Sequence, residues 1–258
     1  MRVQEFVAAL ELPSGCRVDQ RVPKKMLVEN GAPTAADKRL LNDAIEEFQW
    51  LAALKPNTIG VPEFRDEVRE YLEIAVLCVT LRGGVDDQAR KPANVVRLSE
   101  LVHRAVPYPV VLMLDAPQGL SVSMAHKRWA QNEAGKVVLD GDVVSVTLAD
   151  DVDASHPFGQ AVALRSQPQA SLMALYQGWI ECLQALQASR HTGAFKVADT
   201  PENAHARRLA LQECERLGAA AARLRTQAAK EKQLPRQVEL NLALKRVQAE
   251  LAVTRGHL

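Results

Sequence analysis

The stretch IAVLCVTL, residues 74–81, decides how this chain folds. It is a continuous apolar run rich in β-branched side chains, and Gly83-Gly84 closes it after a single arginine. An uninterrupted apolar run of this length, bounded by glycine, is typical of a strand that is covered on both faces of its sheet. We therefore predict a central β-strand here, with the rest of a sheet built around it.

The residues after this strand alternate between helical and extended patterns. They predict a helix over 94–106, a buried strand over 108–114, a half-buried strand from Gly119 to Met124 and a β-hairpin over 136–148. The hairpin prediction rests on Asp140-Gly141, which lies between two β-branched runs and favours a two-residue turn. The helix prediction rests on apolar positions at helical spacing that stop at Pro107.

Upstream of the central strand, residues 34–54 carry apolar side chains at helical spacing. Thr34 is a suitable N-cap, and Pro56 marks a stop, so we predict one amphipathic helix over this range. The order of elements is then helix, strand, helix, strand and a β-meander. This order predicts an α+β domain over residues 1–165, with a mixed sheet and its helices on one face.

Beyond residue 165 the chain has a different character, and we assign residues 166–258 to a helical arm. Residues 149–168 are expected to form a linker, and 169–188 a helix. From Pro201 onward, two sets of apolar residues follow the four-and-three spacing of coiled coils, the first ending at Ala228 and the second running from Leu240 to Leu251.

These two sets are out of register with each other, and Pro235 lies between them. Because proline inside a helix removes a hydrogen bond and clashes with the preceding turn, a break near residues 233–235 is expected. We favour a coiled-coil-like helical hairpin; a kinked continuous helix that dimerises is the alternative.

The charge of the chain is unevenly distributed. From Pro201 onward there are eleven Lys/Arg and six Asp/Glu, a net charge of +5, whereas the preceding residues carry 21 basic and 25 acidic side chains, a net charge of −4. The four cysteines are far apart, which favours buried thiols in a reducing cytoplasm over disulfides or a zinc site. No apolar stretch is long enough to span a membrane, so no membrane partner is expected.

Several stretches, taken in order, resemble one bacterial family. They are VDQRVPKKMLVEN (18–30), IEEFQWLAALKPNTI (45–59), YLEIAVLCVTLR (71–82), AVPYPVVLML (105–114) and KEKQLPRQVELNLALKRVQAEL (230–251). In these residues the chain resembles the family known as domain of unknown function 4391. The resemblance implies a setting beside helicase and DNA-methyltransferase genes, in restriction or phage-defence loci. It implies no catalytic residue, and Pro235 departs from the helix-compatible residue that the family has there.

A nuclease is the first enzyme to test for in such a setting. Restriction-type nucleases hold a divalent metal with carboxylates on neighbouring strands and place a lysine beside it. Glu73, Asp115 and Lys127 are the residues to consider, but Ala125 stands where the second strand should carry an acid. We therefore expect no catalytic residue, no metal and no cofactor, and we interpret His103 and His126 as structural.

The basic residues are the remaining candidates for a site. The predicted contacts with nucleic acid or a protein partner are Lys24, Lys25, Arg223, Arg225, Lys230, Lys232, Arg236 and Lys245. Lysine and arginine neutralise phosphates in a salt-sensitive manner, but charged side chains also line coiled coils without binding anything. We expect a non-enzymatic accessory subunit of a restriction or phage-defence system, docked through its arm to a helicase, a methyltransferase or a second copy. A DNA-binding module and a divergent nuclease are the alternatives.

Overall fold

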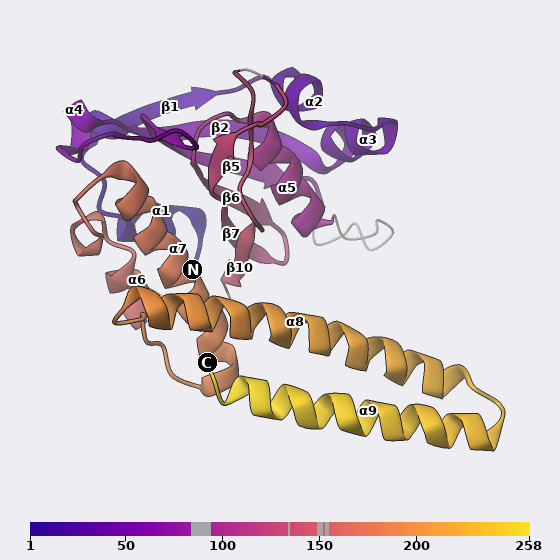
Figure 1. The fold of residues 1–258 in the computed structure, drawn as a ribbon. Helices are drawn as coiled ribbons and strands as arrows, with labels where there is room; N and C mark the ends of the chain where they lie inside the picture. The colour runs from indigo at the N-terminus through magenta and orange to yellow at the C-terminus, as the bar shows by residue number, and fades with distance from the viewer. Residues whose placement is uncertain (84–93, 134, 149–151, 153–154) are drawn as a thin grey trace. The chain divides into compact units, whose positions relative to one another are not determined.

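The central strand β5 (Ile74–Leu81) forms as predicted and lies in the middle of a six-stranded sheet (Figure 1). The computed structural model describes residues 1–83, 94–133, 135–148, 152 and 155–258. The sheet order is β1 (Arg17–Arg21), β2 (Ile45–Leu54), β5, β6 (Val110–Ala116), β7 (Gly119–Met124) and β10 (Val144–Leu148). The β5–β6 pair is parallel and the other pairs are antiparallel, so the α+β mixed sheet is confirmed.

The core of the domain lies where three helices cover one face of this sheet. These helices are α2 (Lys25–Gly31), α3 (Ala35–Ala44) and α5 (Val95–Ala105). They pack against alternate residues of the central strands, including Leu77 and Val79 of β5. Because the intervening Val76 is also buried, both faces of β5 are covered, as the apolar run predicted.

A close approach of α2 to α5 fixes this arrangement locally. Gly31 ends α2 against α5, and a Cβ atom at that position would lie 2.4 Å from the carbonyl oxygen of Leu101. Only a glycine lets the two backbones come this close without displacing one of them.

The prediction of one helix over residues 34–54 is wrong. Thr34 does cap α3, since its hydroxyl accepts a hydrogen bond from the Asp37 amide at 3.1 Å, but the helix ends at Ala44. The following residues form β2, which pairs with β1 on one side and β5 on the other. The apolar residues of β2 also fit a helical period, and the backbone partners that select the strand lie far away in the sequence.

The predicted hairpin turn at Asp140-Gly141 is also wrong. The strand before it, β9 (Val137–Leu139), pairs with β8 (Lys127–Trp129) in a separate two-stranded sheet, whereas β10 after it joins the main sheet. Asp140 instead accepts hydrogen bonds from the Arg69 guanidinium, with Nε at 2.7 Å. At this turn the chain passes from the two-stranded sheet to the main sheet. The same turn residues would also suit a hairpin, so local turn chemistry cannot distinguish the two cases.

The segment expected to be a linker contains a short helix, α6 (Pro157–Ala161). Its Phe158 is fully buried and stacks on Phe6 of α1 (Val3–Ala9), with ring centroids 6.3 Å apart. A second two-stranded sheet pairs β3 (Phe64–Arg65) with β4 (Glu70–Tyr71), and α4 (Pro56–Ile59) precedes it.

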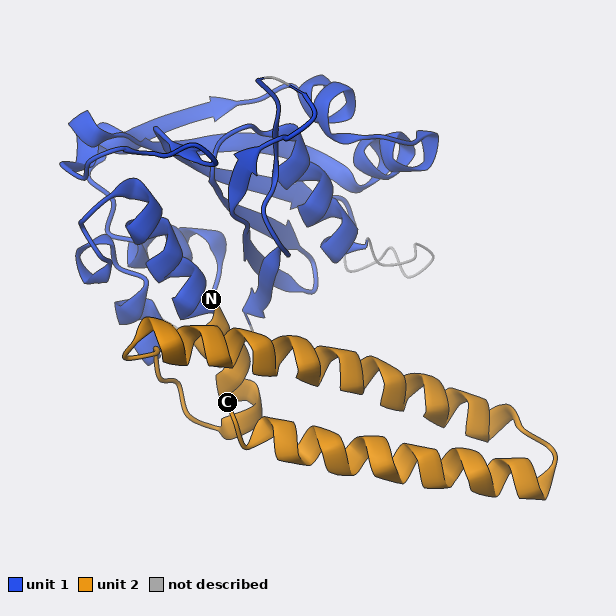
Figure 2. Cartoon of the chain, in the orientation of Figure 1, with its two compact units in different colours: residues 1–183 blue, residues 184–258 orange. Residues whose placement is uncertain are grey.

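The chain divides into two compact units, residues 1–183 (unit 1) and 184–258 (unit 2) (Figure 2). The division falls inside α7 (Leu172–Thr192), whereas the boundary expected from the sequence lay at residue 165. In unit 2, α8 (Pro201–Lys230) and α9 (Leu234–Arg255) pack together as a helical hairpin (Figure 1). The predicted break is confirmed, and Pro235 lies in the first turn of α9, where its missing N–H costs nothing.

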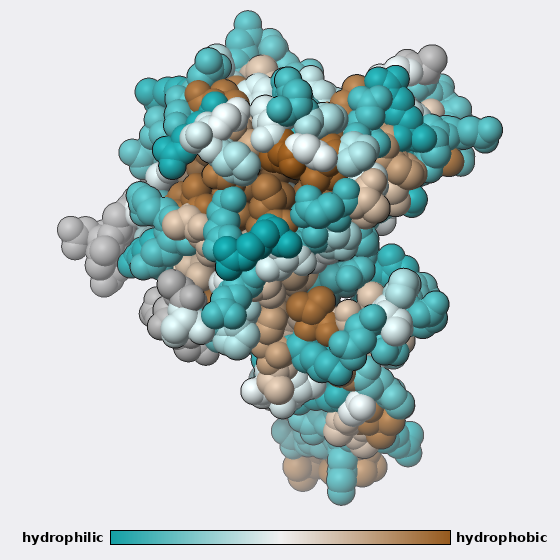
Figure 3. Space-filling model, turned by 90° about the vertical axis from the view of Figure 1, so that its left-hand side faces the viewer, coloured by the Kyte–Doolittle hydropathy of each residue, from teal (hydrophilic) through white to brown (hydrophobic). Residues whose placement is uncertain are grey.

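One face of unit 1 carries apolar residues at its surface. On the side where Figure 1 labels α1 and α4, apolar residues of unit 1 gather between hydrophilic ones (Figure 3), as is ordinary for a protein surface. Within the described ranges, no helix combines the length and the apolar character needed to cross a bilayer.

Candidate functional site

A buried lysine closes the C-terminal end of α5. Lys127 of β8 is only 3% exposed, and its Nζ donates hydrogen bonds to the carbonyl oxygens of His103 and Val106. The last carbonyl groups of a helix have no partner within the helix and carry partial negative charge. Lys127 satisfies two such carbonyls at once and so ties β8 to α5.

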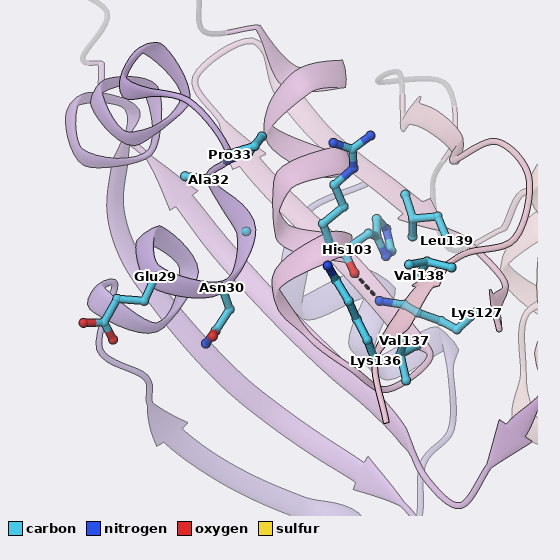
Figure 4. Close-up of a pocket in the computed structure, with 12 residues that line it drawn as sticks. Glu29, Asn30, Ala32, Pro33, His103, Lys127, Lys136, Val137, Val138 and Leu139 are labelled. Carbon is cyan, nitrogen blue, oxygen red and sulfur yellow. Dashed lines mark hydrogen bonds between the residues drawn. The ribbon is translucent and has the colours of Figure 1, made fainter. Parts of the chain in front are cut away.

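Lys127 lies at the wall of a pocket of about 480 Å³ (Figure 4). The pocket is lined by the end of α2, by His103 and Arg104 of α5, and by Lys136 and residues 137–139. His103 is fully buried, and its Nε2 lies 3.1 Å from the Ser123 hydroxyl. Burial, followed by the nearby Lys127 charge, lowers the pKa of His103 well below its usual value, so this imidazole is neutral.

The other cations of the pocket already have partners. Arg104 forms an ion pair with Glu100 at 2.5 Å, and Lys136 forms one with Glu133 at 2.8 Å. Burial lowers the pKa of Lys127 to about 7, which is a value that suits a proton-transfer group. However, its ammonium is directed at two backbone carbonyls, so the geometry assigns Lys127 to holding α5, β8 and the pocket wall together.

A second polar network links β4 to α7. The His126 Nδ1 lies 2.5 Å from the Tyr71 hydroxyl, and its Nε2 lies 2.7 Å from the Gln177 side-chain oxygen. Beside it, the fully buried Tyr176 donates a hydrogen bond to the Val110 carbonyl at 2.7 Å. Sequence reasoning treated His126 singly, because its partners lie about fifty residues away on either side and no local spacing reveals them.

The residues considered for a nuclease do not come together. Glu73 precedes β5 and pairs with Lys55 at 3.1 Å, whereas Asp115 lies near the end of β6, in register with Thr80. Since β5 and β6 are parallel, the two carboxylates lie at opposite ends of the strands, about 23 Å apart at about 3.3 Å per residue. They cannot share one metal ion in this fold.

The predicted basic contacts fall into the two different units. In unit 1, Lys24 is half-buried and donates a hydrogen bond to the Ile45 carbonyl, so it holds α2 to β2. Burial and the neighbouring charges of Arg82 and Arg21 lower the Lys24 pKa. Lys25 is exposed and pairs with Glu29 at 3.4 Å.

In unit 2, the predicted basic contacts gather in the distal half of the hairpin, which we define as residues 223–246. Arg223, Arg225 and Lys230 lie on α8, Lys232 lies in the connection, and Arg236 and Lys245 lie on α9; all six are exposed. This half contains seven basic and two acidic residues, a net charge of +5, whereas the rest of residues 201–258 contains four of each. The whole excess charge of the hairpin therefore lies in its distal half.

Most of these cations have no internal partner. Arg236 lies 3.6 Å from Glu231, but Arg223, Lys230 and Lys245 form no ion pair with any carboxylate in the described part of the chain. Like charges held together without counter-charges raise the local potential and attract anionic groups. The distal half is thus the strongest candidate for a contact site on this protein.

Comparison with known proteins yields one match. A family model described as "Domain of unknown function (DUF4391)" matches residues 10–251. No curated protein and no solved structure matches the chain.

Proposed function

The chain belongs to the family described as domain of unknown function 4391, and from this premise we propose that it is a non-enzymatic interaction subunit. Unit 1 is the scaffold, and the distal half of the hairpin is the contact element. The observation that carries the proposal is the net charge of +5 on residues 223–246, whose seven basic side chains are all exposed.

The partners of three basic residues in unit 1 support the assignment of unit 1 as the scaffold. Its Arg97 donates to both carboxylate oxygens of the buried Asp37 at 2.9 Å, and these contacts lower the Asp37 pKa to about 2. Arg69 and Lys127 are likewise committed to partners within the fold. These three cations of unit 1 therefore stabilise the domain, whereas the exposed cations of the distal half are available to another molecule.

The setting that we propose is a bacterial restriction or phage-defence system, in which the protein acts with a helicase or a DNA methyltransferase. This setting rests on the gene neighbours that the family resemblance implies. An acidic surface on such a partner would complement the distal half and would give fast, salt-dependent association.

Replacing Arg223 and Lys230 together by alanine is expected to weaken this docking. Both side chains are exposed on α8, so the hairpin itself should fold normally. The full-length protein is co-expressed with the neighbouring helicase and methyltransferase, and the amount of each that co-purifies is measured. The matched control replaces Arg208 and Arg255, two exposed arginines in the remainder of residues 201–258, whose net charge is zero. Equal recovery with both double variants would contradict the proposal.

The second candidate function is binding of duplex DNA by the same distal half, which the same charge favours. The affinity for a short duplex should fall steeply between low and moderate salt, because each phosphate contact releases counterions. Removing Arg223 and Lys230 should lower the slope of log K against log salt by about 2. The Arg208 and Arg255 variant should keep the original slope, and absence of binding at low salt would exclude this function.

A further inference from the structure

The outer face of α9 is apolar, unlike that of α8. On α9, Leu240, Leu244, Val247 and Leu251 face α8 and are half-buried. A second stripe on the opposite side of the same helix is exposed: Leu234 at 74%, Val238 at 56%, Leu242 at 54% and Val253 at 68%, with Ala249 and Lys245 between them. A helix with apolar residues on two opposite sides normally packs on both.

The outer face of α8 shows what an exposed face of this hairpin otherwise contains. Its exposed residues at the corresponding spacing are Arg208, Gln212, Glu215, Ala219, Arg223, Thr226 and Lys230, and Ala219 is the one apolar residue among them. α8 is therefore an ordinary amphipathic helix with one apolar side, and the second apolar side is specific to α9. A molecule that covers this exposed apolar side must therefore be complementary to α9.

The sequence of the outer stripe is complementary to its own reversed copy. Its positions are symmetric about the point between Ala243 and Leu244: Leu242 and Lys245 flank that point, then Val238 and Ala249, then Leu234 and Val253. In an antiparallel pair of α9 helices, each larger aliphatic side chain of one copy would face a smaller one or the Lys245 stem of the other.

The residues that flank the stripe are complementary in charge. Glu239 and Arg246 lie on one flank of α9, seven residues apart, so they cannot pair within the helix. In the antiparallel arrangement, Glu239 of each copy would lie beside Arg246 of the second copy, which makes two equivalent ion pairs. On the other flank, Asn241 would face Gln248 of the second copy, a polar and compatible pair.

We propose that two copies of this chain associate through the outer faces of their α9 helices, in antiparallel orientation. The self-complementary stripe selects a second copy, and the paired Glu239 and Arg246 select the antiparallel register. Lys245 within the stripe weakens the contact but restricts it to that register, as polar residues in coiled-coil cores do. This proposal names a second copy of the chain as one partner of the interaction subunit. It rests on the proposed function only because both involve the same hairpin.

Charge reversal tests the arrangement. The full-length protein is studied by sedimentation velocity over a wide concentration series, and the wild type is expected to form a dimer. Glu239→Arg alone should raise the dissociation constant by about tenfold or more, because two like-charge contacts replace two ion pairs; Arg246→Glu alone should do the same. The double variant should regain the wild-type dissociation constant. Arg208→Glu on the outer face of α8, outside the distal half, is the matched control and should leave the dimer dissociation constant unchanged.

Mixing the two single variants gives the decisive result. The Glu239→Arg and Arg246→Glu proteins should form a heterodimer with each other, because both contacts are then between opposite charges. A wild-type monomer at every concentration, a dimer insensitive to the reversals, or a mixture that forms no heterodimer would each overturn the proposal. Recovery of the helicase or methyltransferase by the Arg223 and Lys230 variant is a separate measurement, so failure of the dimer and failure of the proposed function can be told apart.

Discussion

Replacing Trp179 with alanine is expected to lower the free energy of unfolding by about 3–5 kcal/mol, as for other fully buried aromatic side chains. Trp179 of α7 is completely buried in unit 1, and its Nε1 donates a hydrogen bond to the Val162 carbonyl at 2.8 Å. The substitution removes a large apolar side chain and also leaves a buried carbonyl without its donor. Both losses act in the same direction.

The measurement is denaturant unfolding followed by circular dichroism. Trp179→Phe is the matched control, because it keeps most of the packing and loses mainly the hydrogen bond. Its cost should be clearly smaller, with about 1–3 kcal/mol from the unpaired carbonyl. A loss below about 1 kcal/mol for Trp179→Ala would show that α7 does not contribute to the core in this way.

The second large effect is a pH dependence that Lys127 creates. Burial lowers its pKa in the folded protein to about 7 from the usual 10.5, so between these values the unfolded chain binds one more proton than the folded one. Stability must therefore rise with pH across this window, at up to about 1.4 kcal/mol per pH unit. Below pH 7 the lysine is charged in both states and the dependence should vanish.

Lys127→Met isolates this contribution, because methionine has similar length and no charge. The free energy of unfolding of both proteins is measured from pH 6 to pH 10.5, and only the difference between the two curves is compared. That difference should be level near pH 6 and should grow in favour of the wild type above pH 7. Parallel curves over the whole range would mean that the carbonyls of His103 and Val106 keep the ammonium charged throughout.

The sequence correctly predicted the helices and strands that are specified by residues close together in the chain. The apolar run of β5, the amphipathic pattern of α5 and the N-cap residue Thr34 each act within a few residues. The break in the hairpin belongs to this group, since Pro235 disfavours a helix interior in any context. The net charge of the distal half was also readable in the sequence, because it depends only on composition.

Tertiary structure decided the features that depend on long-range pairing. The segment Ile45–Leu54 fits either period, and only its place between β1 and β5 makes it a strand. Asp140-Gly141 has the chemistry of a hairpin turn, yet the flanking strands pair with other partners. In the same way, Lys127 in the sequence is a charged residue near a strand end, and only the fold buries it against the end of α5.

The helical hairpin has features of both kinds, some set by the local sequence and some by tertiary packing. The sequence by itself determined that residues 201–258 are helical with a break near Pro235, because helical spacing and the geometry of proline are local. The choice between a hairpin and a kinked continuous helix was left open, and the packing of α8 against α9 decides it. Only the tertiary structure decided which apolar side of α9 is covered, because the spacing alone places Leu240 and Leu242 on a helix without saying which one faces α8. Burial is a property of the packed neighbours: α8 packs on the side of α9 that carries Leu240 and leaves Leu242 exposed.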